Sequence, residues 1–149
     1  MSASAIVTAT QTILQAALNG QTPVPNVILG IPITLNDSTT VYLFHDGYHD
    51  VEKVPGGVVQ RHHVIPIHLM LLSTADPEQA EASVMALSDL IANAFYTNRR
   101  LNATAASSDL HQRDGEHTSA GQFVLEGGSE YRHRFWTLHA REDLTFVFA

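Results

Sequence analysis

The feature that most constrains the fold is a long apolar stretch, residues 58–72, that ends just before a strong helix start. In its second half, one set of alternate positions is apolar: Ile65, Ile67, Leu69 and Leu71. This alternation predicts a β-strand. Apolar residues on both faces toward Leu72 predict that this end is covered on both sides. Pro66 cannot donate a hydrogen bond to a neighbouring strand, so we expect a bulge or an edge there.

The element that follows is predicted as a helix over residues 76–98. Asp76 is a favourable N-cap, Pro77 suits the first helical position, and Gln79 stands where a capping-box partner would. Apolar residues then recur at helical spacing: Ala80, Val84, Leu87, Ile91, Ala94 and Phe95. Met85 falls about 140° from this stripe, so we expect it to be one of the scattered exposed apolar side chains.

A similar apolar stripe near the start of the chain predicts a first helix over residues 3–19. Its members are Ile6, Val7, Ala9, Ile13, Leu14, Ala17 and Leu18. Asn19 and Gly20 both tolerate the left-handed conformation that ends helices. Residues 22–25 contain two prolines and predict an extended connector.

Shorter β-branched or aromatic runs predict further strands at residues 27–29, 31–35, 40–44, 122–125, 131–140 and 144–148. Residues 45–57 contain glycine and proline and are predicted to form a loop or a flexible hairpin tip. Residues 102–121 are polar and contain a turn signal, and Glu142-Asp143 is also expected in a turn. The order of elements predicts one α+β domain, with a mostly antiparallel sheet packed against two main helices.

Charge and composition exclude several classes of protein. The formal net charge of −7 argues against a general nucleic-acid binder and against a polybasic membrane-binding patch. No run approaches the roughly 20 apolar residues of a membrane span, and residues 1–18 lack the positive start of a secretory signal. We therefore expect a soluble protein with no membrane partner. The absence of cysteine excludes thiol catalysis and Cys-ligated metals.

Nine histidines raise the question of a metal site. His45-Asp46 and His49-Asp50 recur four residues apart, but His62 and His63 are adjacent and would face opposite sides of a strand. No HExxH or comparable spacing is present. We expect no metal site, and imidazoles that lie on the surface or are lightly buried. An alternative is that titrating histidines tune an assembly near pH 6.

The sequence contains no GxSxG elbow, no phosphate-binding loop and no dinucleotide-binding glycine pattern. Its carboxylate pairs fall in predicted turns, where solvated side chains are the more economical interpretation. Neither an enzyme nor a bound cofactor is therefore expected. Arg132, Arg134 and Trp136 suggest single-stranded nucleic-acid binding only weakly. A tryptophan packed in the core, with the arginines at an interface, suits the acidic chain better.

The layout of the chain resembles the tail-terminator (tail-completion) proteins of long-tailed bacteriophages. The resemblance rests on an opening amphipathic helix, a Val/Pro connector, a hydrophobic strand that leads into an Asp-Pro-Glu-Gln-Ala-Glu helix start, and an aromatic β segment. These features occupy residues 5–18, 23–27, 63–72, 76–81 and 131–148. The resemblance spans nearly the whole chain.

This resemblance implies an α+β subunit that assembles into a six-fold ring. Such a ring caps the finished tail tube, stops tube polymerisation and contributes to the neck that joins tail to head. The implied partners are further copies of the chain, a tail tube protein and a neck or head-completion protein. Genomic DNA would pass through the lumen without specific binding. The protein would be assembled in the host cytoplasm and located in the virion tail.

Polar excursions at residues 45–57 and 109–121 could reach a neighbouring subunit or the tube. Charge is uneven, with −6 in residues 1–98 and −1 in residues 99–149. Unlike faces could therefore meet. The candidate interface residues are His45, His49, Lys53, Arg61, Arg99, Arg100 and Arg113. Alternative functions are a neck or head-closure protein, a tail-tube subunit, or a small α+β enzyme or ligand-binding domain with an enclosed pocket.

Overall fold

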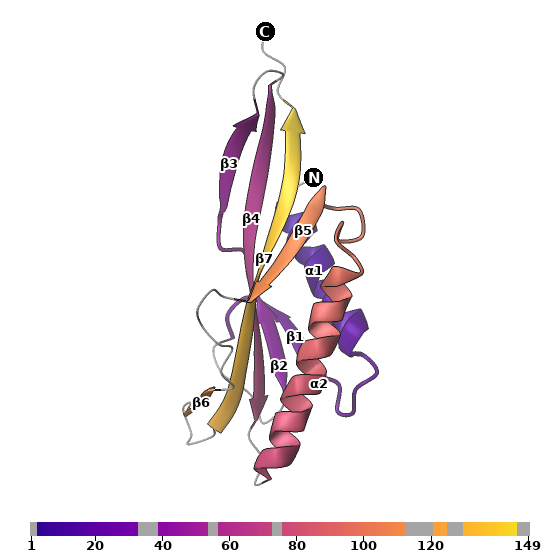
Figure 1. Cartoon of the computed structure of the whole chain (residues 1–149), viewed down its shortest axis with the longest axis vertical. Helices are drawn as coiled ribbons and strands as arrows, with labels where there is room; N and C mark the ends of the chain where they lie inside the picture. Colours follow the sequence, from indigo (N-terminus) through magenta and orange to yellow (C-terminus); the bar gives the residue numbers. More distant parts are fainter. Residues whose placement is uncertain are drawn as a thin grey trace.

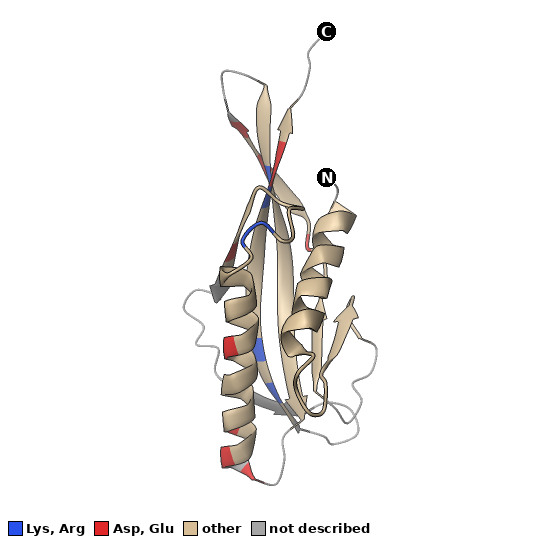
Figure 2. Cartoon of the chain, turned by 90° about the vertical axis from the view of Figure 1, so that its right-hand side faces the viewer, with Lys and Arg blue, Asp and Glu red and all other residues tan. Residues whose placement is uncertain are grey.

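The computed structural model describes residues 3–32, 39–53, 57–72, 76–112, 121–124 and 130–145. The elements are α1 (Ala3–Leu18), β1 (Asn26–Leu29), β2 (Thr40–Leu43), β3 (Tyr48–Lys53), β4 (Val58–Leu72), α2 (Pro77–Tyr96), β5 (Ser107–Gln112), β6 (Gly121–Val124) and β7 (Glu130–Thr145). The strands form one sheet, and both helices lie on the same face of it (Figure 1 and Figure 2). The predicted α+β fold is confirmed.

The pairing of β4 with β7 is the central feature of the sheet. The two strands run antiparallel through fifteen consecutive residue pairs, from Val58↔Thr145 to Leu72↔Tyr131. β4 has the predicted bounds, but β7 is one strand where a turn at Glu142-Asp143 was expected. That prediction was wrong because β4 supplies a backbone partner along this whole length, and Glu142 points into a buried site.

Shorter strands complete the sheet on either side of this pair. β2 and β3 pair with successive halves of β4, and β5 and β6 pair with successive parts of β7. β1 lies beside β2 and is parallel to it, whereas the other pairs are antiparallel. The expected loop at residues 45–57 therefore contains β3, and the polar stretch after residue 101 contains β5. β3 forms a hairpin with β4, which agrees with the hairpin alternative for residues 45–57, whereas β5 was missed because its partner β7 is distant in sequence.

Pro66 lies where the partner of β4 changes from β2 to β3. The Val64 carbonyl accepts a hydrogen bond from the Asp46 amide, and the Val64 amide donates one to the Gly47 carbonyl. Two residues of one segment, Asp46 and Gly47, thus lie opposite the single residue Val64 of β4. This arrangement is a bulge. The expected interruption of the ladder is thus found beside the proline, where the missing N–H is tolerated.

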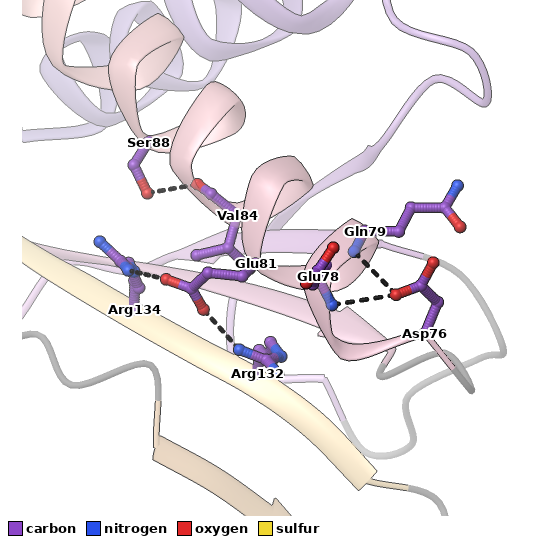
Figure 3. Close-up of polar contacts among 8 residues, drawn as sticks. All are labelled: Asp76, Glu78, Gln79, Glu81, Val84, Ser88, Arg132 and Arg134. Atoms are coloured by element: carbon purple, nitrogen blue, oxygen red, sulfur yellow. Dashed lines mark hydrogen bonds and ion pairs between the residues drawn. The ribbon is translucent and has the colours of Figure 1, made fainter.

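Both helices form much as the sequence predicts. The Asp76 carboxylate accepts hydrogen bonds from the amides of Glu78 and Gln79, at 3.0 and 3.4 Å between the heavy atoms (Figure 3). α2 ends at Tyr96, two residues earlier than expected, and Met85 is 50% exposed as predicted. In α1 the buried Thr10 hydroxyl donates to the Ile6 carbonyl, so the helix buries no unsatisfied group there.

One hydrophobic core fills the space between the helices and the sheet. Its largest fully buried side chains include Trp136, Phe95, Leu14, Ile65 and Ile67. Beside this core, Glu81 of α2 accepts hydrogen bonds from Arg132 and Arg134 of β7 (Figure 3). These two arginines were expected at an interface, but they hold α2 to the sheet within the chain.

Strand length explains the most unusual part of the shape. Fifteen extended residues span about 50 Å, whereas the twenty residues of α2 span about 30 Å. The paired strands therefore extend well beyond the helices. We call this projection the arm; it consists of residues 48–53, 58–63 and 140–145 (Figure 1).

Replacing Ile67 with alanine tests the core. Ile67 is fully buried at the centre of β4, so we expect Ile67→Ala to lower the free energy of unfolding by about 2–5 kcal/mol. The measurement is urea denaturation. Met85→Ala is the control and should change stability by less than about 0.5 kcal/mol. Equal losses in the two variants would contradict the described packing.

Candidate functional site

Six polar or aromatic side chains gather on one face of the arm, where it leaves the body. The strand register explains this grouping, because Tyr48 pairs with His63, Asp50 with Arg61, and Arg61 with Glu142. Paired residues point to the same face of a sheet. We call this group the arm-root cluster: His45, Tyr48, Asp50, Arg61, His63 and Glu142.

A buried chain of hydrogen bonds forms the inner part of the cluster. His63 Nε2 lies 3.2 Å from Glu142 Oε1, and His63 Nδ1 lies 2.9 Å from His45 Nε2. The side chains of His63 and Glu142 are only 2% and 3% exposed. An ionised carboxylate only accepts, so His63 donates to Glu142 through Nε2 and accepts from His45 through Nδ1. The chain ties β4 and β7 to the segment that precedes β3.

The surroundings of these buried hydrogen bonds also make protonation of His45 less favourable. Burial lowers the pKa of His45, and a positive charge on His63, when that ring is protonated, lowers it further, against an opposing effect of Asp46. The imidazoles of His45 and His63 share one hydrogen, so two imidazolium rings could not keep this contact. Acid should therefore weaken the attachment of the arm.

The outer part of the cluster is a fixed ion pair. Arg61 donates from Nε and Nη2 to the two carboxylate oxygens of Asp50, at 2.9 and 3.1 Å. The same guanidinium lies 4.0 Å from the centre of the Tyr48 ring. The hydrogen bond from Arg61 lowers the pKa of Asp50. Pairs this exposed add little stability, but this one holds Arg61 in a defined position.

The hydrogen bonds of His63 attach the arm to the body and occupy both of its ring nitrogens. A histidine paired with a carboxylate can act as a general base only if its other nitrogen reaches a substrate. His63 fails this condition because His45 occupies that nitrogen and the residue is 1% exposed. Among the described residues, no group of three or more acidic or histidine side chains is arranged to hold a metal ion.

Other histidines form stacked pairs on the opposite face of the sheet. His49 stacks on His62 with ring centres 4.9 Å apart, and His68 stacks on His133 at 5.1 Å. His68 Nδ1 and His133 Nε2 are also within hydrogen-bond distance, at 2.8 Å. Burial lowers the pKa of His133. These contacts are short pairings across neighbouring strands. The expectation of surface or lightly buried imidazoles was wrong for His63, which is 1% exposed.

Of the predicted interface residues whose side chains the structure describes, two come together, His45 and Arg61. His49 lies on the other face of the arm, and Lys53 ends β3, with its side chain outside the described atoms. Arg99 pairs with Asp109 at 2.9 Å, Arg100 is exposed in the turn after α2, and Arg113 lies outside the described residues. Contact of these residues with another subunit stays a prediction.

Sequence reasoning missed Tyr48, His63 and Glu142. A signal was available, because Glu142 continues the alternation of Leu138 and Ala140, and His63 continues that of Ile65 and Ile67. Each polar residue thus lies on a face that is otherwise buried. The 79-residue separation between His63 and Glu142 hid their pairing.

The pH dependence of the free energy of unfolding tests the buried hydrogen bonds between His45, His63 and Glu142. Because the folded state lowers the pKa of His45 below 6.5, the unfolded chain binds protons more readily. The contribution of His45 to stability is therefore present above pH 6.5 and is lost as pH falls toward the lowered folded value. We expect the His45→Gln variant to lose less stability than the wild type between about pH 7.5 and 5.5.

The measurement is urea denaturation at several pH values, with His49→Gln as the matched control. His49 takes no part in the hydrogen bonds between His45, His63 and Glu142. The His49→Gln variant should therefore keep the wild-type pH dependence of stability. The same slope in the wild type and the His45→Gln variant would contradict the role given to His45. The effect of Asp50, whose pKa is lowered from 3.8, belongs to a lower pH range and does not interfere.

Searches with the sequence match no family model and no curated protein. Among solved structures, the chain is similar to the PVC sheath/tube terminator of an extracellular contractile injection system, determined by cryo-EM in an extended state. The TM-score is 0.58 and the sequence identity is 15%. The match covers 100% of this chain, which spans 61% of the length of that chain. The chain therefore has a tail-terminator-like fold.

Proposed function

We propose that this protein is a structural subunit that forms a ring on the end of a phage-type tail tube. The ring would contain six copies, stop further polymerisation of the tube and form part of the junction between tail and head. The observation that carries this proposal is the structural similarity to a sheath/tube terminator, which covers the full length of the chain. The layout of the sequence supports the same function independently.

The shape of the subunit suits a closed ring. Head-to-tail contacts need two different surfaces on each copy, and the rotation between copies must close. The arm provides one projecting surface, and the helical body provides another (Figure 1). The arm-root cluster would keep the arm at a constant angle, which a ring of defined size requires.

A structural function also agrees with the chemistry of the site. The buried histidine of the cluster has no nitrogen open to a substrate, and the similar solved structure is named as a terminator. No helix in the described ranges has the length and apolarity to cross a membrane. We propose a location in the tail, after assembly in the host cytoplasm beside a tube protein and a neck protein.

The distribution of charge supports a lumen through which DNA passes without binding. The chain has a net charge of −7, so like charge would oppose binding of phosphates. In the described part of the chain, most arginines are already engaged with a carboxylate: Arg61, Arg99, Arg132, Arg134 and Arg141. Few free guanidinium groups remain to hold a phosphate backbone.

Light scattering coupled to size exclusion tests the ring directly. We expect one discrete species near six times 16.3 kDa, with a mass that stays constant over a range of protein concentrations. Measurements at low and moderate salt would show whether charged side chains hold the contacts.

Two results would contradict this proposal. Growth of the mass without limit as concentration rises would indicate a tube subunit. A monomer or dimer at every concentration would contradict a self-closing ring and favour a small ligand-binding domain. Each result thus points to a different class of protein.

A further inference from the structure

Two arginines of β7, Arg132 and Arg134, share a single carboxylate. Arg132 donates from Nη1 to Glu81 Oε2, and Arg134 Nη2 lies 3.2 Å from Glu81 Oε1. Glu81 therefore lies between the two guanidinium groups, where α2 packs against β7 (Figure 3). We call these three residues the arginine site.

The arginine site has more positive than negative charge and lies mostly out of water. The side chains of Arg132 and Arg134 are 11% and 17% exposed, whereas that of Glu81 is 37% exposed. A charge removed from water is costly unless an opposite charge and hydrogen-bond partners compensate it. Glu81 compensates one of the two guanidinium groups, so a second carboxylate would neutralise the site.

The hydrogen-bond donors of the two arginines lead to the same conclusion. Glu81 accepts from one terminal nitrogen of each, which leaves the other terminal nitrogen of each without an acceptor in the part of the chain that the structure describes. Both Nε atoms are buried and also lack an acceptor there. Because folded proteins pair nearly all buried donors, this deficit indicates a group that a single copy lacks.

The enclosure of the site limits the kind of anion that it can hold. Guanidinium groups that are this buried cannot lie along the backbone of a DNA duplex. A single Asp or Glu side chain can enter beside Glu81, whose own side chain is the most exposed of the three. A carboxylate also matches the planar guanidinium group through paired N–H···O bonds.

Other copies of the chain can supply this carboxylate. Each copy has 15 acidic residues against 8 basic ones. Among the described residues, several exposed carboxylates take part in no ion pair: Asp46, Glu52, Glu78 and Asp89. In a closed ring every copy contributes the same two surfaces, so one carboxylate from each copy would complete one arginine site.

We propose that the arginine site binds a carboxylate side chain of a neighbouring copy, which inserts beside Glu81 and neutralises the second arginine. This inference rests on the proposed ring function and adds a specific contact between its subunits. Arginine suits such a contact because its guanidinium group can donate to two carboxylates at once.

Zero-length cross-linking tests this contact, because the chain contains a single lysine, Lys53. In a Lys53→Arg, Arg134→Lys double variant, the only lysine amine lies in the arginine site. A carbodiimide should then join this amine either to Glu81 of the same copy or to the carboxylate of the neighbour. We expect both products, the second as a ladder of covalent oligomers on a denaturing gel. Mass spectrometry of the joined peptides would identify the neighbour's carboxylate.

The matched control is a Lys53→Arg, Arg141→Lys double variant. Arg141 also pairs with one carboxylate, since its Nε lies 3.2 Å from Asp143 Oδ1, but it lies on the opposite face of the sheet from Arg132 and Arg134. This variant should give no more ladder than Lys53→Arg alone, in which the terminal amine sets the background.

Three results would overturn the contact. A bond to Glu81 without a ladder, in a protein that light scattering shows to be an oligomer, would contradict the contact and leave the ring intact. An equal ladder from the control would do the same. A monomer without a ladder at every concentration would contradict the ring proposal as well.

Arg134→Gln gives a second readout that does not depend on the reactivity of the lysine. Arg132 stays bonded to Glu81 in this variant, so the fold should persist, and the melting temperature checks this. Glu81 alone then neutralises the site, so the mass measured by light scattering should shift toward the monomer. Arg141→Gln should leave the mass unchanged. A folded Arg134→Gln variant with the mass of the wild-type oligomer would contradict the proposal.

Discussion

The pairing of β4 with β7 determines most of this structure. Fifteen consecutive residue pairs form a two-stranded ladder that is longer than either helix. The part beside the helices buries an alternating apolar face, and its partners on β2 and β5 widen the sheet. The part beyond the helices has β3 beside it and only the first residues of β5, at the root, and becomes the arm. One length difference thus divides the subunit into a packed body and a projection.

A projection of this kind needs a fixed attachment if it is to set the geometry of an assembly. The arm-root cluster provides one, because Glu142 of β7, His63 of β4 and His45 before β3 are joined by consecutive hydrogen bonds. A buried carboxylate and imidazole are costly to desolvate unless they are paired. Their pairing therefore favours one arrangement of the three segments over the alternatives. The same groups make the attachment sensitive to acid.

The sequence predicts the elements that have a strong local signal. β4 has the expected bounds because its β-branched and alternating apolar residues form a long run, and both helices end within two residues of the prediction. β3 was predicted only through the hairpin alternative, because its charged residues and flanking glycines resemble a loop, and only β4 supplies its hydrogen bonds. β7 was divided in two because adjacent carboxylates usually mark solvent. The partner of Glu142 lies 79 residues away, so the alternation could mark Glu142 and His63 as buried but could not show that they pair.

Electron microscopy of the purified oligomer tests the central claim most directly, because it shows how the copies meet. We expect closed rings with a wide central channel, in which each arm lies across the body of its neighbour. Six copies per ring would agree with the proposed cap on a tail tube. Open helical filaments, or compact particles without a channel, would contradict the account.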